Sequence, residues 1–364
     1  MIDRVIMEKG EEEYLPLKER IELRISLYNS FRRLDVLQNL IDDPDITEVM
    51  INGPEHIFVE RRGAMEMWEQ EFDSEEQLED MIQQMVSRVN RTVNVASPIA
   101  DARLLDGSRV HVVLPPVSMD GPVVTIRKFP RQITMDMLIE TGSITGEAAE
   151  FLKRLVRAGY NIFISGGTNS GKTTFLNALS AYIPADERVI TIEDSAELKI
   201  QQVKNLIRLE TRMANAQGEG AITIADLIRA SLRMNPDRII VGEVRGSEAT
   251  ELLSSFNTGH DGGLSSGHGN SPKDMLARLE TMVLLGADLP LAAIRSQIAS
   301  ALDILIHLGR IRDKSRKVLW ITEVDDYEAG EIRLNTLYRF EEGKLRKKGE
   351  LKNREKLIMA GEGI

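Results

Sequence analysis

The sequence predicts an α/β protein in which a helix-covered, mainly parallel β-sheet follows a smaller α+β domain. In the C-terminal half, short continuous apolar strands alternate with helical patterns, which is typical of a parallel sheet buried on both faces. In the N-terminal half, short β-prone runs are broken by turn residues, which is typical of antiparallel strands. The chain of 364 residues has room for two or three such domains.

The N-terminal part is predicted to contain a helical segment followed by the α+β domain. Leu, Ile and Phe recur at intervals of three and four residues between Leu15 and Ile41, so we assign residues 1–41 to a helical segment. Turn residues indicate an antiparallel meander over 45–68. The other elements expected in this domain, residues 42–130, are a helix at about 74–90 and strands at 108–114 and 122–128.

The C-terminal domain is predicted to span residues 146–364, after a linker of mixed composition at 131–145. Its expected strands are 161–165, 188–192, 205–209, 238–242 and 263–267. Its expected helices follow the caps Thr145 and Ser271, or begin at Lys172, at Thr223 and near residue 247. We interpret residues 317–340 as an antiparallel extension and the basic segment 344–356 as a solvated end.

Composition and charge exclude several classes of function. The chain has no cysteine, so disulfides, thiolate zinc sites and thiol nucleophiles are excluded. The net charge of −11 argues against a general nucleic-acid binder, because phosphate neutralisation needs a surplus of Lys and Arg. No apolar run is long enough to span a membrane, and the first residues are charged, so we expect a cytoplasmic protein.

The segment GGTNSGKTT fits the phosphate-binding pattern G-x-x-x-x-G-K-S/T, directly after a predicted strand and at the start of a predicted helix. Glycines let the backbone turn its N–H groups toward phosphate oxygens, and the helix N-terminus adds partial positive charge. Lys172 would reach the β- and γ-phosphates, and the Thr173 hydroxyl would hold Mg²⁺. The predicted nucleotide-binding residues of this loop are Gly166, Gly167, Thr168, Asn169, Ser170, Gly171, Lys172, Thr173 and Thr174. The alternative is a glycine turn that only caps a helix.

Two acidic strand ends are candidates for the chemistry of hydrolysis. Glu243 follows the apolar strand 238–242 and could orient and deprotonate a water molecule in line with the γ-phosphorus. Glu193 and Asp194 follow the strand 188–192, and we expect them to approach Mg²⁺ and its waters, because ligands lie off the carboxyl ends of parallel strands. The alternative for each is a carboxylate that faces solvent.

A glycine-rich segment at 257–272 carries two of the five histidines of the chain, His260 and His268. His268 follows a predicted strand and could contact the γ-phosphate. A structural hydrogen bond is the alternative, and the His spacing matches no familiar zinc site.

These boxes together resemble those of the secretion-system traffic ATPases, the superfamily of type II and type IV secretion and pilus-assembly motors. The resemblance covers residues 42–340 and rests on "GGTNSGKTT" as Walker A, "TIEDSAEL" as the aspartate box, "RIIVGEVRG" as Walker B and "TGHDGGLSSGHGNSP" as the histidine box. "DGSRVHVVLPP" and "TIRKF" in the N-terminal domain also match. Within the superfamily, the sequence is most similar to the ATPase class of tight-adherence (Flp-type) pilus assembly, the CpaF class.

The resemblance implies a hexameric ring of two-domain subunits, with a PAS-like N-terminal domain, a RecA-like P-loop ATPase domain and ATP bound between them. It implies that Glu243 is the catalytic glutamate, that Glu193 is an accessory acid and that His268 lines the site. Arg109, Arg127 and Lys128 would face the nucleotide from the N-terminal side. The cofactors would be ATP and Mg²⁺, and the partners an inner-membrane platform that the motor joins peripherally.

Arginines are further candidates, because negative charge develops on the phosphoryl group during transfer. In such motors an arginine from a neighbouring subunit can complete the site. The candidates are Arg208, Arg212, Arg229 and Arg233. The last two are four residues apart, so we expect them to share a helix face. A surface ion pair is the alternative for each.

The motifs predict an ATPase that powers Flp-type pilus assembly or related protein secretion. They do not fix the cargo, the direction of transport or the choice between ATP and GTP. One alternative is a nucleotide-gated structural ring with little hydrolysis, which an intact Glu243 disfavours. Another is a DNA-conjugation motor, which the net charge of −11 disfavours.

Overall fold

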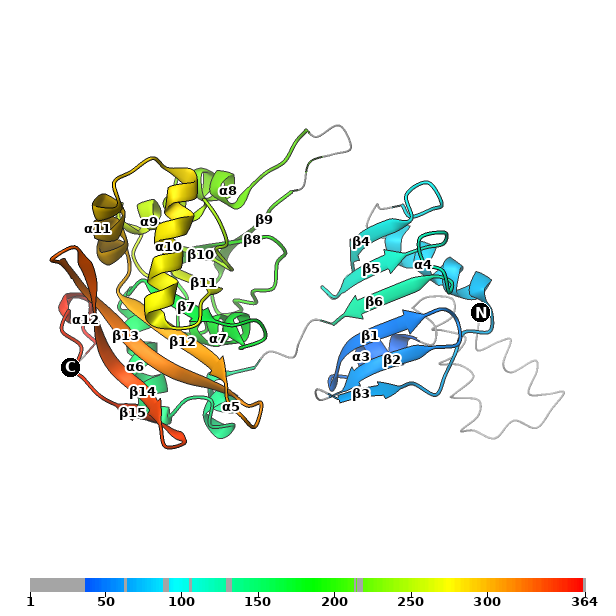
Figure 1. The fold of residues 1–364 in the computed structure, drawn as a ribbon, viewed down its shortest axis with the longest axis horizontal. Helices are drawn as coiled ribbons and strands as arrows, with labels where there is room; N and C mark the ends of the chain where they lie inside the picture. Colours follow the sequence, from blue (N-terminus) through cyan, green and yellow to red (C-terminus); the bar gives the residue numbers. More distant parts are fainter. Residues whose placement is uncertain are drawn as a thin grey trace. The chain divides into compact units, whose positions relative to one another are not determined.

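The computed structural model describes residues 37–61, 64–87, 92–104, 107–128, 133–212, 214 and 219–362. The chain divides into two compact units, Met1–Arg131 and Gln132–Ile364 (Figure 1). The helices expected between residues 15 and 41 lie outside the described residues, apart from a short helix at Gln38–Asp42.

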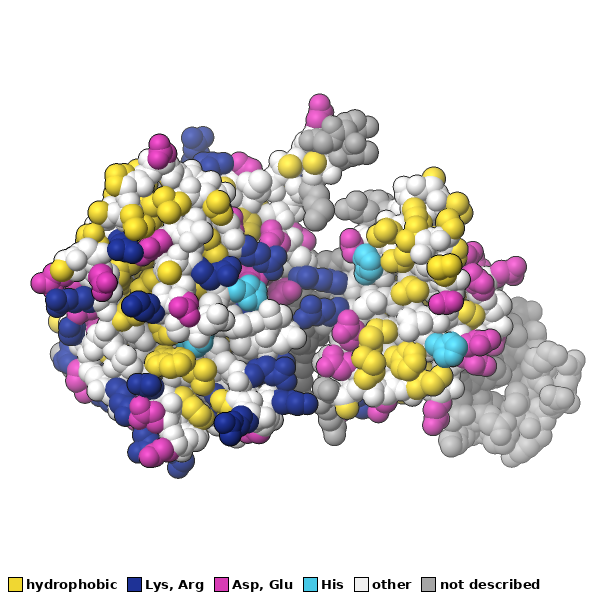
Figure 2. All heavy atoms as spheres, viewed as in Figure 1, with side chains coloured by type: hydrophobic (Ala, Val, Ile, Leu, Met, Phe, Trp, Pro, Cys, Tyr) yellow, Lys and Arg dark blue, Asp and Glu magenta, His cyan; other side chains and the backbone are white. Residues whose placement is uncertain are grey.

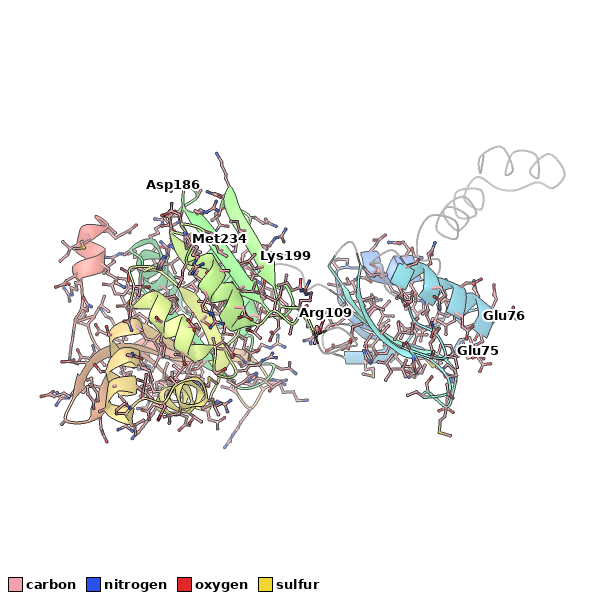
Figure 3. All side chains as sticks on the ribbon, turned by 90° about the horizontal axis from the view of Figure 1, so that it is seen from above. Glu75, Glu76, Arg109, Asp186, Lys199 and Met234 are labelled. Atoms are coloured by element: carbon pink, nitrogen blue, oxygen red, sulfur yellow. The ribbon has the colours of Figure 1, made fainter. Side chains whose placement is uncertain are left out.

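The first unit is an antiparallel sheet with helices, in agreement with the predicted α+β domain. The strand order is β3-β2-β1-β6-β5-β4, and every pair of neighbours is antiparallel. The elements are α3 (Gln38–Asp42), β1 (Ile46–Asn52), β2 (Ile57–Arg61), β3 (Ala64–Met67), α4 (Glu75–Ser87), β4 (Ile99–Arg103), β5 (Arg109–Val113) and β6 (Val123–Arg127). Helix α4 starts at Glu75 and Glu76 (Figure 3) and buries Leu78, Ile82 and Met85 in the core of this unit.

The second unit contains a sheet of nine strands in the order β15-β14-β13-β12-β7-β11-β10-β8-β9. The strands from β12 to β9 in this order are parallel, and those from β12 to β15 are antiparallel. Its strands are β7 (Ile162–Gly166), β8 (Arg188–Glu193), β9 (Asn205–Glu210), β10 (Arg238–Val241), β11 (Leu264–His268), β12 (Ile304–Arg310), β13 (Arg316–Glu328), β14 (Glu331–Glu341) and β15 (Lys344–Lys347). The predicted parallel sheet with an antiparallel extension is confirmed.

Helices cover both faces of this sheet, as Figure 1 shows. They are α5 (Met135–Glu140), α6 (Gly146–Arg157), α7 (Lys172–Ser180), α8 (Ile224–Ser231), α9 (Ala249–Phe256), α10 (Pro272–Gly286), α11 (Leu291–Ala301) and α12 (Glu355–Met359). Side chains alternate between the faces along a strand. Ile162 and Ile164 of β7 therefore pack with α5, α6 and α7, whereas Phe163 between them packs with α8 to α11. This double burial explains the continuous apolar strands of the sequence.

The predicted helix starts are confirmed by their caps. The side chains of Thr145, Thr223 and Ser271 each accept a hydrogen bond from the backbone N–H three residues later, which satisfies a donor that the helix leaves unpaired. At Thr223, Asp226 also accepts from the Thr223 backbone N–H and completes a capping box.

Two sequence-based expectations about the chain ends of the second unit are wrong. The predicted linker 131–145 contains α5, which packs with α6 and α7, and Met135 is buried. The basic segment 344–356 is not a solvated end, because it contains strand β15 and buries Leu345 and Leu351 in the core. In the sequence, charged residues stand on both sides of Leu345 and of Leu351, so no apolar pattern indicates that the two leucines are buried.

Among the described residues, no single helix has both the length and the apolar character needed to cross a membrane. Helices α10 and α11 meet that test of length and composition only as a pair, and the pair is bent by 119°.

A buried arginine joins β10 to α6. Arg238 is 2% exposed and forms an ion pair with Glu187, and its guanidinium also donates to the backbone oxygen of Val156 at the end of α6. Removing one partner of a buried charged network is strongly destabilising. We therefore expect Arg238→Met to lower the free energy of unfolding by about 3 kcal/mol in urea denaturation.

Arg339→Met is a matched control, because Arg339 is an exposed strand residue with a loose ion pair to Glu341 at 3.6 Å. It should change the free energy of unfolding by less than about 0.5 kcal/mol. Equal stability of the two variants would contradict a structural role for Arg238.

Candidate active site

The loop between β7 and α7 has the tight conformation that its glycines predict. A Cβ on Gly166 would lie 2.5 Å from Ser170 Oγ and 2.6 Å from Leu308 O, so no side chain fits there. Gly171, the N-cap of α7, has φ +93°, a conformation that favours glycine. Gly167, Thr168 and Asn169 lie exposed on the loop, and the glycines thus permit a loop whose backbone is open to a ligand.

Lys172 is the first residue of α7, and its side chain folds back over the loop. Its Nζ lies 3.3 Å from Gly166 O and donates to Gly167 O at 3.1 Å, and the residue is 8% exposed. Burial lowers the pKa of Lys172, and the nearby carboxylate of Glu243 opposes this shift. Thr173 and Thr174 follow in the first turn of α7. An anion on the loop would stabilise the charged ammonium, so the residues present fit a bound polyphosphate.

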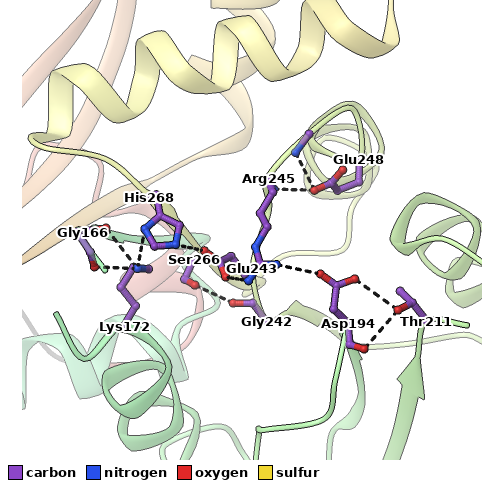
Figure 4. Close-up of polar contacts among 12 residues, drawn as sticks. Gly166, Lys172, Asp194, Thr211, Gly242, Glu243, Arg245, Glu248, Ser266 and His268 are labelled. Atoms are coloured by element: carbon purple, nitrogen blue, oxygen red, sulfur yellow. Dashed lines mark hydrogen bonds and ion pairs between the residues drawn. The ribbon is translucent and has the colours of Figure 1, made fainter. Parts of the chain in front are cut away.

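His268 connects Lys172 with Glu243 (Figure 4). His268 ends β11, next to β7 in the sheet, and Glu243 follows β10 on the other side of β11. His268 Nδ1 is 3.3 Å from Lys172 Nζ, and its Nε2 is 2.8 Å from Glu243 Oε1, although this second contact is not aligned as a hydrogen bond. Burial, with the charge of Lys172, lowers the pKa of His268. The structure thus brings together three predicted residues from three separate boxes.

Arg245 is a member of the site that the sequence analysis did not select. One of its guanidinium nitrogens donates to Glu243 Oε2 at 2.6 Å, and the other lies 3.6 Å from Asp194 Oδ2 (Figure 4). The hydrogen bond to Glu243 raises the pKa of Arg245. Its position two residues after Glu243 in "GEVRG" was the available signal. Arg245 therefore links the two acidic strand ends.

The two acids after β8 have different environments. Glu193 is 4% exposed, and its carboxylate accepts the backbone N–H groups of Glu197 at 2.8 Å and Leu198 at 3.0 Å. Asp194 is half-exposed, accepts from the Thr211 hydroxyl at 3.4 Å and faces Arg245. Glu193 therefore holds the loop after β8, whereas Asp194 belongs to the open polar cluster. A metal role for either residue stays a prediction.

The described residues include no group of three or more His, Asp and Glu side chains placed to hold a metal ion. This is compatible with Mg²⁺, which keeps several waters and usually binds through one or two protein groups and substrate phosphates. Glu193 ends β8, so the cluster lies at the carboxyl end of this strand.

The four candidate arginines are all exposed on the second unit. Arg208 lies exposed on β9, and Arg212 Nε donates to Gly220 O at 2.7 Å. Arg229 is exposed and pairs with Asp226 and Glu251. The prediction that Arg229 and Arg233 share a helix face is wrong, because α8 ends at Ser231. The residues after it form a turn, which four-residue spacing alone does not reveal.

The three basic residues expected on the N-terminal side lie in the first unit. Arg109 starts β5 (Figure 3) and is the cross-strand partner of Arg127 at the end of β6. Lys128 is 7% exposed, and its Nζ donates to the backbone oxygens of Leu40, at 2.8 Å, and Asp43. Lys128 therefore satisfies carbonyl groups at the C-terminal end of α3. A nucleotide contact of Arg109 or Arg127 stays a prediction.

A phosphate-loop turn at the carboxyl edge of a parallel sheet, beside a strand-end glutamate, is the site of the P-loop class of nucleotide-binding folds. The chain belongs to the family described as type II/IV secretion system protein, which matches residues 32–347. This confirms the family that the four boxes predict. The finer resemblance to the Flp-type class stays a prediction.

Individual relatives agree with this family. Over 316 residues, the chain is 34% identical to a putative conjugal transfer protein of Mycobacterium tuberculosis, covering 85% of this chain and 89% of that protein. Over 304 residues, it is 34% identical to the type IV secretion system protein VirB11 of Brucella suis, covering 76% of this chain and 84% of that protein.

Solved structures show the same fold. The ATPase DotB of Legionella pneumophila aligns with a TM-score of 0.56 at 19% identity, covering 79% of this chain and 80% of that one. The pilus retraction motor PilT, solved with bound ADP, aligns with a TM-score of 0.55 at 17% identity, covering 87% and 83%. The predicted architecture, a RecA-like P-loop domain after a smaller α+β domain, is confirmed.

Proposed function

We propose that this chain is a Mg²⁺-dependent ATPase that powers Flp-type pilus assembly or a related type II or type IV secretion process. The observation that carries the proposal is the continuous series of contacts from Lys172 on the phosphate loop through His268 to Glu243. A phosphate-binding cation, a group beside the terminal phosphate and a general base are what hydrolysis at a γ-phosphate requires.

The residues would divide the work as follows. The loop N–H groups and Lys172 bind the phosphates, and the Thr173 hydroxyl helps to hold Mg²⁺, which neutralises phosphate charge when bound. Glu243 orients the attacking water and accepts its proton, while Arg245 holds the glutamate in place. His268 contacts the γ-phosphate. Before the nucleotide binds, His268 contacts the ammonium of Lys172. Asp194 would lie next to the water molecules bound to Mg²⁺, and Glu193 would hold the loop after β8.

The proposal includes a hexameric ring that joins an inner-membrane platform peripherally from the cytoplasmic side. The support is the family membership, together with the exposure of the four candidate arginines, Arg208, Arg212, Arg229 and Arg233. One of these exposed arginines would enter the site of a neighbouring subunit. The nucleotide-gated ring with little hydrolysis has less support, because His268 contacts both Glu243 and Lys172 of the phosphate loop.

A DNA-conjugation motor is the second candidate, and the name of the Mycobacterium tuberculosis relative favours it. The net charge of −11 disfavours direct DNA binding by this chain. Turnover strongly stimulated by DNA at physiological salt would reverse our preference.

The test is steady-state ATP hydrolysis measured against protein concentration, with light scattering under the same conditions. We expect specific activity to rise with concentration as the mass rises to several times 40.8 kDa, because neighbouring subunits complete the site. A strict monomer with constant specific activity would support the assignment as an ATPase and contradict a site shared between subunits. An assembled ring without turnover would favour the nucleotide-gated ring instead.

A further inference from the structure

The hairpin formed by β12 and β13 runs beside the phosphate loop. Leu308 of β12 is the cross-strand partner of Gly166, the first glycine of the loop. Basic side chains gather around this hairpin (Figures 1 and 2). They are Arg310, Arg312, Lys314, Arg316 and Lys317. Two of them, Arg316 and Lys317, donate to backbone oxygens of two different segments, so the hairpin is tied to both.

Arg316 holds one peptide plane of the phosphate loop. Its Nε donates to Asn169 O at 3.0 Å, and a Cβ on Gly171 would lie 3.3 Å from Arg316 Cδ. Asn169 has φ +59° and Gly171 has φ +93°, and such left-handed residues let successive N–H groups converge into a concavity that binds anions. Arg316 therefore contacts the two residues that give the loop this shape.

The contact of Arg316 continues through the loop to Lys172. In a trans peptide the C=O and N–H groups point in opposite directions. While Asn169 O accepts from Arg316, the N–H of Ser170 therefore points away from the hairpin, and it donates to Gly167 O at 3.3 Å. The same oxygen accepts from Lys172 Nζ at 3.1 Å. Arg316 thus helps to fix the backbone oxygen that holds the phosphate-binding lysine.

Lys317 ties the hairpin to the turn between α5 and α6, residues 141–143, which we call the α5–α6 turn. Neighbouring side chains of a strand point to opposite faces, so Lys317 points away from Arg316. Its Nζ donates to Thr141 O at 3.1 Å and Gly142 O at 2.8 Å, as a lysine does at a helix C-terminus. The next residue, Val318, is buried, and its N–H donates to Ser143 O at 2.9 Å.

We infer that Arg316 is a positioning residue for the phosphate loop and couples polyphosphate binding to the α5–α6 turn, an inference that rests on the proposed function. The contact favours the loop shape that receives phosphates. By linkage, a bound polyphosphate must strengthen the contact by the factor by which the contact strengthens binding. Arg316 and Lys317 are adjacent in a strand paired with β12, so order gained at Arg316 reaches the turn that Lys317 holds.

The experiment uses inorganic tripolyphosphate as the probe on the full-length chain, with calorimetry for its Kd and hydrogen–deuterium exchange for the amides of the α5–α6 turn and Val318. Arg316→Met should raise the Kd by about fivefold, the loss of one exposed hydrogen bond. In the unmodified chain, saturating probe should slow exchange at these amides by about twofold to fivefold. In Arg316→Met, probe at saturation should leave their exchange unchanged.

Arg312→Met is the matched control, because Arg312 is exposed at the tip of the same hairpin and the change removes the same charge. It should alter the Kd by less than about twofold and preserve the slowing of exchange. Equal weakening of binding in the two variants would show that charge alone attracts the probe, and it would overturn the positioning role of Arg316.

The exchange data separate this inference from the proposed function. If saturating probe did not slow exchange at the turn in the unmodified chain, or slowed it equally in Arg316→Met, the coupling would be overturned and the proposed function would stand. Slowing that disappears only in Arg316→Met supports the coupling, because the probe is bound in every sample. If the unmodified chain bound neither tripolyphosphate nor MgATP, the proposed function itself would fail.

Discussion

Glu243→Gln should reduce the kcat of ATP hydrolysis by about 10²- to 10⁴-fold and leave the Kd of MgATP nearly unchanged. A glutamine has almost the same shape, and its oxygen can still accept from Arg245, so the local structure should persist. It cannot accept the proton of the attacking water at neutral pH. The measurement is single-turnover hydrolysis beside equilibrium binding of MgATP, which separates chemistry from binding.

Glu248→Gln is the matched control for this prediction. Glu248 lies in the same turn and accepts the backbone N–H groups of Arg245 at 2.6 Å and Gly246 at 2.9 Å, contacts that a glutamine oxygen can retain. We expect Glu248→Gln to keep most of the activity. If Glu243→Gln hydrolysed ATP as fast as the unmodified chain, Glu243 would not be the base.

The sequence was informative about elements whose burial is simple. β7 is buried on both faces and reads as a continuous apolar run, and Ser271-Pro272 is a strong start signal for α10. The strand β12 and the helix α11 escaped prediction, although both are largely apolar, because no turn or cap signal separates them. Their connection is short, and α11 ends only at Ala301 before β12 starts at Ile304.

The site was predictable where a box fixes a residue at the end of a strand. Glu243, His268 and Lys172 fall on adjacent elements, so their meeting follows from the sheet order. The sequence did not predict which charged side chains contact the backbone of their own unit instead of a ligand. Lys128 and Glu193 were selected as groups facing a ligand, yet their charged ends satisfy backbone groups of their own units. Only the local path of the chain decides between these environments.

Lys172→Met should weaken MgATP binding by about 100-fold or more and abolish hydrolysis, because a charge-assisted contact to the phosphates is lost from a buried loop. The same change should not lower the stability of the nucleotide-free chain. The pKa of Lys172 is lowered by burial, which means that the folded state disfavours its charged form relative to the unfolded state. The charge therefore costs stability until an anion binds, and methionine removes that cost.

The two effects can be measured in one thermal unfolding experiment. A ligand at 100 times its Kd stabilises the native state by about 2.7 kcal/mol, so saturating MgATP should raise the Tm of the unmodified chain by several degrees. Lys172→Met should show an equal or higher Tm without nucleotide and almost no further rise with it. Lys204→Met, a change at an exposed lysine, should behave like the unmodified chain. A normal rise in Tm with MgATP in Lys172→Met would show that the ammonium does not bind the phosphates. A lower Tm of this variant without nucleotide would show that the contacts of the ammonium with the loop carbonyls outweigh the cost of burying its charge.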